Sequence, residues 1–210
     1  MKPITSTTQN FLDIEDIVAD LLILKDGSAC MVLLVSAINF DLLSEREQDA
    51  TIFAYAQLLN SLTFSVQIVV TSKQKDISDY VKLLEERLTQ VKSPLLYEQM
   101  NKYRDFIKSI VRQGNVLDKK FYVVIPFSSL ELGTKAAISV LGNRPGLPAP
   151  KIEIAQRSTI NLAPKRDHLI RQFARIGLKA RQLTSEELLQ EFFNYYNRDL
   201  AGTKVNMPQV

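Results

Sequence analysis

A cluster of basic residues between positions 157 and 181 is the feature of the sequence best suited to binding a negatively charged partner. Residues 151–183 carry eight Lys or Arg against two Asp or Glu, a net charge of +6, whereas residues 1–50 carry three against nine, a net charge of −6. Clustered ammonium and guanidinium groups attract partners of opposite sign. The candidate interaction surface therefore consists of five residues: His168, Arg171, Arg175, Lys179 and Arg181.

Three interpretations of this basic region remain open. The first is a solvated helix face, with Leu169, Ile170 and Phe173 turned to the core and the charges turned to water. The second is a docking surface for an acidic protein or an anionic lipid. The third is a nucleic-acid site, which is the least favoured because no aromatic residues that could stack on bases are interleaved with the arginines.

Catalytic motifs are missing from the sequence. It contains no Gly-x-x-x-x-Gly-Lys-Ser/Thr loop and, with seven glycines, no Gly-x-Gly-x-x-Gly loop. The nearest approach is Gly142-Asn143-Arg144-Pro145-Gly146, in which the proline removes an amide donor. One Cys and one His cannot form a zinc site within one chain. We therefore expect no enzyme activity, no catalytic residue, no cofactor and no metal site.

Two isolated polar groups have simple structural explanations. Cys30 lies among Ala29, Met31 and Val32, which predicts a buried thiol and, with no second cysteine, an intracellular protein without an internal disulfide. The carboxylates of Glu45, Glu47 and Asp49 belong to the first turn of a predicted helix, where the helix dipole stabilises negative charge.

The first half of the chain predicts strands and helices that alternate. Residues 14–24 and 28–36 are expected to form a hairpin around the Lys25–Ser28 turn. Ser44 and Glu47 form a capping box for a helix whose apolar residues are Ile52, Phe53, Ala56, Leu59 and Leu62. A strand at 65–71 follows. Apolar residues then repeat at 4-3 spacing over 77–91 and 96–110, and this pattern predicts an antiparallel helical hairpin at about 77–113.

The second half begins with a central strand at 121–127, apolar on both faces and closed by Pro126. Residues 131–164 are expected to form a flexible excursion rich in Pro and Gly, with a mobile tip at 142–150. Within it, Ile152, Ile154, Ile160 and Leu162 are assigned to two short β-like patches. A helix at 167–176, a strand at 178–183 and a last helix capped by Thr184 and Glu187 complete the order.

These elements predict one α+β domain spanning residues 1–210, with a mixed β-sheet of about four to five strands packed by helices. The polar ends at 1–9 and 198–210 are expected to be frayed tails. No apolar run reaches the ~20 residues that a spanning helix needs, so insertion into a membrane is not expected.

Seven stretches along the chain carry packing and turn motifs. They are residues 7–14 (Thr-Thr-Gln-Asn-Phe-Leu-Asp-Ile), 24–28 (Leu-Lys-Asp-Gly-Ser), 35–42 (Val-Ser-Ala-Ile-Asn-Phe-Asp-Leu), 59–62 (Leu-Asn-Ser-Leu), 120–127 (Lys-Phe-Tyr-Val-Val-Ile-Pro-Phe), 175–180 (Arg-Ile-Gly-Leu-Lys-Ala) and 183–197. In this order they resemble the N-terminal, non-motor domain of the TraC-like ATPases of conjugation and type IV secretion. The resemblance covers most of residues 7–197 except the Pro- and Gly-rich excursion.

In that family the domain precedes a motor that carries the P-loop, and this sequence has no counterpart of the motor's residues. The resemblance implies a non-catalytic adaptor or scaffold of a type IV secretion machine, either as a stand-alone chain or as a fragment of a longer ATPase. It implies a cytoplasmic location, with peripheral attachment at the inner membrane, and partners that include a motor ATPase and a small inner-membrane subunit. A homo-oligomer is also compatible. The alternative is an independent module that binds nucleic acid or lipid headgroups through residues 157–181.

Overall fold

The computed structural model describes residues 12–74, 78–112, 117–132 and 147–197. The chain forms two compact units. The first comprises residues 1–69 and 121–210, and the second comprises residues 70–120. The expected tails at 1–9 and 198–210 lie outside the described residues.

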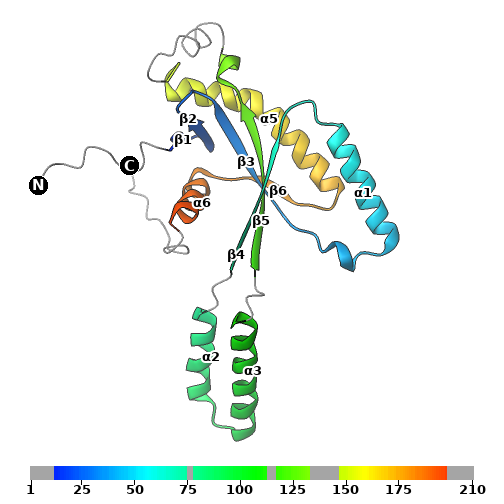
Figure 1. The fold of residues 1–210 in the computed structure, drawn as a ribbon, viewed down its shortest axis with the longest axis vertical. Coiled ribbons are helices and arrows are strands. Elements are labelled where there is room, and N and C mark those ends of the chain that lie inside the picture. Colours follow the sequence, from blue (N-terminus) through cyan, green and yellow to red (C-terminus); the bar gives the residue numbers. More distant parts are fainter. Residues whose placement is uncertain (1–11, 75–77, 113–116, 133–146, 198–210) are drawn as a thin grey trace, which may run out of the picture. The chain divides into compact units, whose positions relative to one another are not determined.

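An open six-stranded sheet forms the centre of the fold, in the order β1-β2-β3-β5-β4, with β6 paired to β3. The registers of β1 with β2, β2 with β3, and β3 with both β5 and β6 are antiparallel. The predicted α+β class is therefore confirmed (Figure 1). The strands are β1 (Ile14–Val18), β2 (Leu21–Leu24), β3 (Ala29–Val35), β4 (Gln67–Gln74), β5 (Leu117–Phe127) and β6 (Ala180–Gln182).

The region predicted as one strand at 14–24 is instead two strands, which corrects the sequence interpretation. The chain reverses at Ala19 and Asp20, whose φ angles are 53° and 60°, and Val18 then pairs with Leu21. Two consecutive positive φ angles define a tight hairpin turn that normally needs Gly or Asn. Alanine gives no signal for such a turn, so the strand pattern conceals it. The turn at 25–28 forms as expected.

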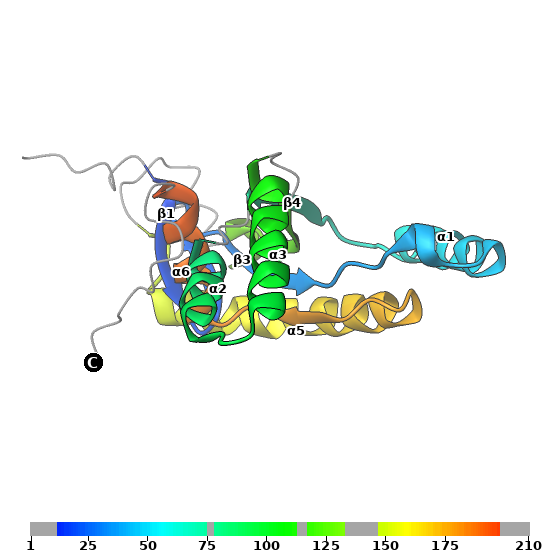
Figure 2. The ribbon, with the colours of Figure 1, turned by 90° about the horizontal axis from the view of Figure 1, so that it is seen from below.

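The described residues of the first unit form the helices α1 (Glu45–Asn60), α5 (Lys151–Arg175) and α6 (Ser185–Tyr196). Short 3₁₀ turns occur at η2 (Phe40–Leu42) and η3 (Ser129–Leu132). The capping boxes predicted at Ser44 and Thr184 are both present. Figures 1 and 2 show α5 along one face of the sheet, α6 on the other, and α1 reaching beyond the sheet beside the end of α5.

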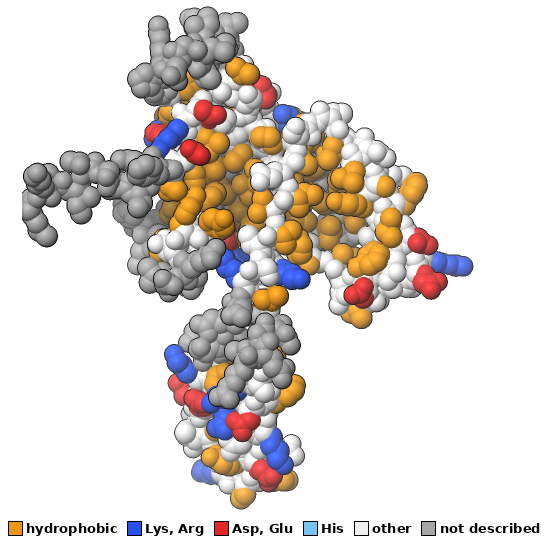
Figure 3. Space-filling model, in the orientation of Figure 1, with side chains coloured by type: hydrophobic (Ala, Val, Ile, Leu, Met, Phe, Trp, Pro, Cys, Tyr) orange, Lys and Arg blue, Asp and Glu red, His pale blue; other side chains and the backbone are white. Residues whose placement is uncertain are grey.

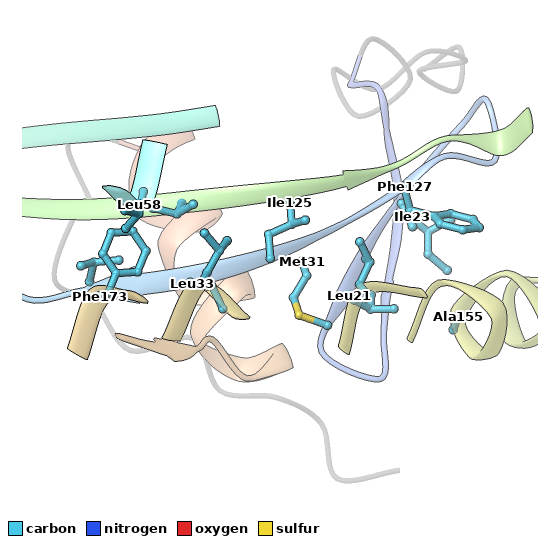
Figure 4. Close-up of a cluster of buried hydrophobic side chains, with 14 of the residues drawn as sticks. Leu21, Ile23, Met31, Leu33, Leu58, Ile125, Phe127, Ala155 and Phe173 are labelled. Atoms are coloured by element: carbon cyan, nitrogen blue, oxygen red, sulfur yellow. The ribbon is translucent and has the colours of Figure 1, made fainter. Parts of the chain in front are cut away.

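The main core lies between the sheet and α5. Alternate β3 residues Met31 and Leu33 lie in one buried cluster with α5 residues such as Ala155 and Phe173 (Figure 4). A smaller cluster, formed by Val32, Tyr122, Leu183 and Leu188, fills the opposite face under α6. Because side chains alternate along a strand, a strand covered on both sides reads as continuously apolar. The residues of β3 and β5 show this pattern.

Helix α5 overturns the expectation of a loose excursion from 151 to 164. Ile154 and Leu162 are fully buried against the sheet, whereas Ile152 and Ile160 are 67% and 74% exposed. These residues therefore lie on one continuous helix and not on two β-like patches. Pro164 lies inside α5 and conceals the helix in the sequence, because an internal proline costs about 3 kcal/mol. Burial of the apolar face offsets that cost.

The residues just before α5 are packed against the main core, through Leu147 and Ala149. The ring of Pro148 lies against Gly27, where an added Cβ would overlap it. The described part of the predicted mobile tip is therefore held by the core. Residues 133–146 lie outside the described residues.

The second unit contains the predicted helical hairpin, formed by α2 (Ser78–Gln90) and α3 (Pro94–Arg112). Leu88 is buried in its seam, and Val81, Leu84, Met100 and Ile107 are partly buried. Two further predicted seam residues, Leu96 and Tyr103, are about half exposed (51% and 46%), and Ile77 lies outside the described residues. The hairpin is also bridged by Glu85 and Lys108, whose Oε1 and Nζ are 2.6 Å apart.

Candidate interaction surface

The five basic candidates do not form one surface with one role. His168 of α5 faces the end of α1, where its Nε2 lies 3.1 Å from Ser61 Oγ. The edge of its ring also meets Phe64, with centroids 6.3 Å apart. His168 therefore joins α1 to α5 and belongs to the packing of the fold.

Arg181 on β6 is engaged with a carboxylate. Its Nη1 and Nη2 each donate to Glu187 on α6 at 2.6 Å, in a bidentate pair. This partner, together with the amide of Thr184, lowers the pKa of Glu187 to about 2, and the carboxylate raises the pKa of Arg181. The charge of Arg181 is largely balanced inside the structure.

Arg171, Arg175 and Lys179 remain exposed. Arg171 and Arg175 are four residues apart on α5 and share a helix face. Arg175 donates from Nη1 to Gln172 at 3.4 Å. Three of the five candidate residues therefore present positive charge to solvent.

The pair Ser61 and His168 was not singled out in the sequence, and it places a hydroxyl beside an imidazole. Ser61 Oγ donates its single proton to the carbonyl of Leu58 at 2.8 Å. The imidazole must therefore donate to Ser61, which is the reverse of the arrangement that activates a serine nucleophile. Across the described residues, no group of three or more His, Cys, Asp or Glu side chains could hold a metal ion.

The sequence-based prediction that the apolar residues of α1 face the core is wrong for most of them. Leu58 is the residue of α1 that is buried, and Figure 4 shows it beside Phe173 of α5. Ile52, Phe53 and Leu59 are 57%, 66% and 46% exposed. A core face was expected from the spacing of these residues, but α1 packs against α5 through Leu58 instead. The apolar face is left open.

Along α1 these exposed residues continue into acids at 4-3-4-3 spacing. The stripe, called here the α1 stripe, consists of Glu45, Asp49, Ile52, Ala56 and Leu59, all exposed. Residues at this spacing lie on one face of a helix. Figure 3 shows apolar side chains gathered over α1, with both acidic and basic side chains at its outer end. The α1 stripe is thus apolar at one end and negative at the other.

An open antiparallel sheet with helices on both faces and an exposed, two-part helix stripe defines an α+β domain with a surface suited to protein contact. Residues 17–198 match the model of the archaeal TraC-like domain. This match covers most of the chain, and the chain belongs to the family of archaeal TraC-like domains. No curated protein matches it.

The family membership confirms the resemblance predicted from the seven packing motifs. It points to a role related to conjugation or secretion. Along the described part of the chain, no helix is both long enough and apolar enough to cross a membrane.

Proposed function

We propose that this chain is a non-catalytic adaptor or scaffold of a conjugation-type secretion machine, docking onto a motor ATPase and a small membrane subunit. Its membership of the TraC-like family supports the setting. The observation that carries the adaptor role is the open apolar face of α1, formed by Ile52, Phe53 and Leu59. The proposed location is cytoplasmic, at the membrane surface where such a machine assembles.

The exposed side chains of α1 give a physical reason for docking. Fully burying one Ile, Leu or Phe side chain stabilises a complex by about 1.5–3 kcal/mol. Leu42 of η2, which precedes α1 in the chain, is also 81% exposed. Contiguous apolar surface of this kind marks protein interaction sites.

The side chains most often used in catalysis have structural roles here, which supports the non-catalytic part of the proposal. Burial raises the pKa of the Cys30 thiol to about 11, so the reactive thiolate is disfavoured at neutral pH. His168 is engaged with Ser61. The sequence carries no phosphate-binding loop.

Site-specific photocrosslinking in cells tests the adaptor role. A photoreactive phenylalanine analogue replaces Phe53 in one variant and Ile160, an exposed apolar residue of α5, in the control. We expect the Phe53 variant to crosslink to the motor ATPase or to the small membrane subunit, identified by mass spectrometry, and the Ile160 variant to yield neither. Equal crosslinking from both positions, or ATP hydrolysis by the purified chain that survives contaminant controls, would refute the proposal.

A second candidate function is anionic-ligand binding, which the shared exposed face of Arg171 and Arg175 favours. It predicts binding to single-stranded DNA or anionic vesicles that weakens steeply with salt. Because Arg181 is paired with Glu187, the informative variant changes Arg171, Arg175 and Lys179 to Glu. Equal binding by this variant and by the unchanged chain would eliminate the second candidate.

A further inference from the structure

The α1 stripe has two chemically different ends, and both are exposed. From its middle to its C-terminal end, α1 presents Ile52, Ala56 and Leu59, and its first two turns present Glu45 and Asp49. We propose, building on the adaptor function above, that this stripe binds one amphipathic helix of a partner subunit. That helix carries apolar residues at 3-4 spacing that continue into Lys or Arg residues placed beside the acids.

The apolar half of the stripe offers a surface for a covering element. Packing of an amphipathic face normally supplies most of the stability of a helix in a protein. In α1 the buried residue is Leu58, while Ile52 and Leu59 on the adjacent face are about half exposed. The 4-3-4-3 spacing is the geometry in which two helices interlock side chains along a seam. A helix is therefore the element that fits.

The acidic half determines what kind of helix fits. Glu45 and Asp49 lie on the stripe itself, and Glu47, two residues from each of them and on another side of the helix, adds a negative charge at the same end of α1. The pKa of Glu47 is lowered by hydrogen bonds from the Ser44 hydroxyl and amide. Basic residues on the partner complement these charges and fix its direction along the stripe.

The same charges disfavour two other occupants. In an antiparallel pair with a second copy, Glu45 faces Leu59 and Asp49 faces Ala56, so carboxylates are desolvated against apolar groups. In a parallel pair, acid faces acid. An anionic membrane surface is repelled by the same carboxylates. A basic amphipathic helix avoids all three penalties.

Two synthetic peptides test the proposal. Each is a helix with Leu at 4-3 spacing, and the two peptides differ only at the positions facing the acids, which are Lys in one and Glu in the other. Fluorescence anisotropy with the full chain measures the dissociation constants. We expect the Lys peptide to bind about tenfold more tightly, as complementary charges at an interface allow. The double variant Glu45→Lys with Asp49→Lys should reverse the preference.

Single variants test whether the peptide binds at the α1 stripe or elsewhere on the surface. Ile52→Asp should abolish the binding of the Lys peptide, and Ile160→Asp on α5 should leave it unchanged, with circular dichroism confirming that both variants fold. Three results would overturn the proposal: equal affinity for both peptides, no reversal in the double variant, or an Ile52-dependent dimer or vesicle complex that blocks the peptide.

The peptide-binding test and the crosslinking test of the adaptor function can fail independently of each other. Peptide discrimination without crosslinking to the motor or membrane subunit would refute the adaptor role and keep the helix-binding stripe. Crosslinking without peptide discrimination would keep the adaptor role and refute the stripe.

Discussion

The carboxylate of Asp20 binds the start of α6, 165 residues further along the chain. Asp20 Oδ1 accepts from the backbone amide of Ser185 at 2.6 Å and from its hydroxyl at 2.8 Å. The Ser185 hydroxyl in turn accepts from the amide of Asp20 at 3.0 Å. The first amides of a helix have no partner within the helix. The tight turn between β1 and β2 therefore supplies a cap that fixes α6 on the sheet.

Replacement of Asp20 tests the hydrogen-bonded contact between Asp20 and Ser185. Asp20→Ala removes the acceptor and places an alanine at φ 60°, so we expect a loss of about 2 kcal/mol in the free energy of unfolding. Asp20→Asn keeps an acceptor oxygen and tolerates the left-handed backbone, and it should lose less than half as much. Urea unfolding followed by circular dichroism measures both. Equal losses would show that the Asp20–Ser185 contact contributes nothing.

The pair of Arg181 and Glu187 predicts a pH dependence. The pKa of Glu187 is lowered from 4.5 to about 2 in the folded chain, mainly by Arg181, so the folded state favours the charged carboxylate. Its stabilisation is complete above the ordinary pKa and is lost as the pH falls through about 2. The side chains are 55% and 38% exposed, so water screening limits the contribution to about 1 kcal/mol.

Melting temperatures of the unchanged chain and of Glu187→Gln measure this effect. The difference between them should be constant at neutral pH and should shrink as the pH falls from 4.5 toward 2. A difference that stays constant over this interval would rule out the ion pair as the source of the stabilisation.

The packing of helix α5 predicts different losses of stability when two apolar residues in the segment expected to be flexible are replaced by alanine. Leu162→Ala removes a fully buried side chain and should destabilise the chain by about 2–5 kcal/mol. Ile160→Ala, at a 74% exposed position, should change stability by no more than about 0.5 kcal/mol. Chemical unfolding compares them, and similar effects would argue that 151–164 is not a packed helix.

The seam of the helical hairpin predicts a similar contrast in the second unit. Leu88 is 5% exposed, and Leu88→Ala should cost about 2–4 kcal/mol. Leu83→Ala, at a 47% exposed position of the same helix, is the matched control and should be close to neutral. Hydrogen exchange of the amides of α2 and α3 reports the effect locally, and equal exchange in the two variants would contradict a buried seam.

The sequence predicts elements well where local signals and packing agree. The capping boxes at Ser44 and Thr184 mark α1 and α6, because side-chain caps are local chemistry. It fails at Ala19, whose left-handed backbone has no sequence signal, and at Pro164, whose local cost is outweighed by burial of α5. Both failures are tertiary effects that override a local preference.

The interaction surface is harder to predict for the same reason. Periodicity finds the apolar face of α1 but does not reveal whether Ile52 meets the core or the solvent. Charge counting finds Arg171 and Arg181 together but does not reveal that Arg181 is bound to Glu187. Which faces are covered, and which charges are balanced, depends on the long-range arrangement of the helices.

Sedimentation velocity of the purified chain mixed with the P-loop motor ATPase of the same secretion machine tests the central claim most directly. The adaptor account predicts a complex whose mass is the sum of its components, with no increase in ATP hydrolysis attributable to this chain alone. Independent sedimentation of the two proteins, both with and without the small membrane subunit, would contradict it.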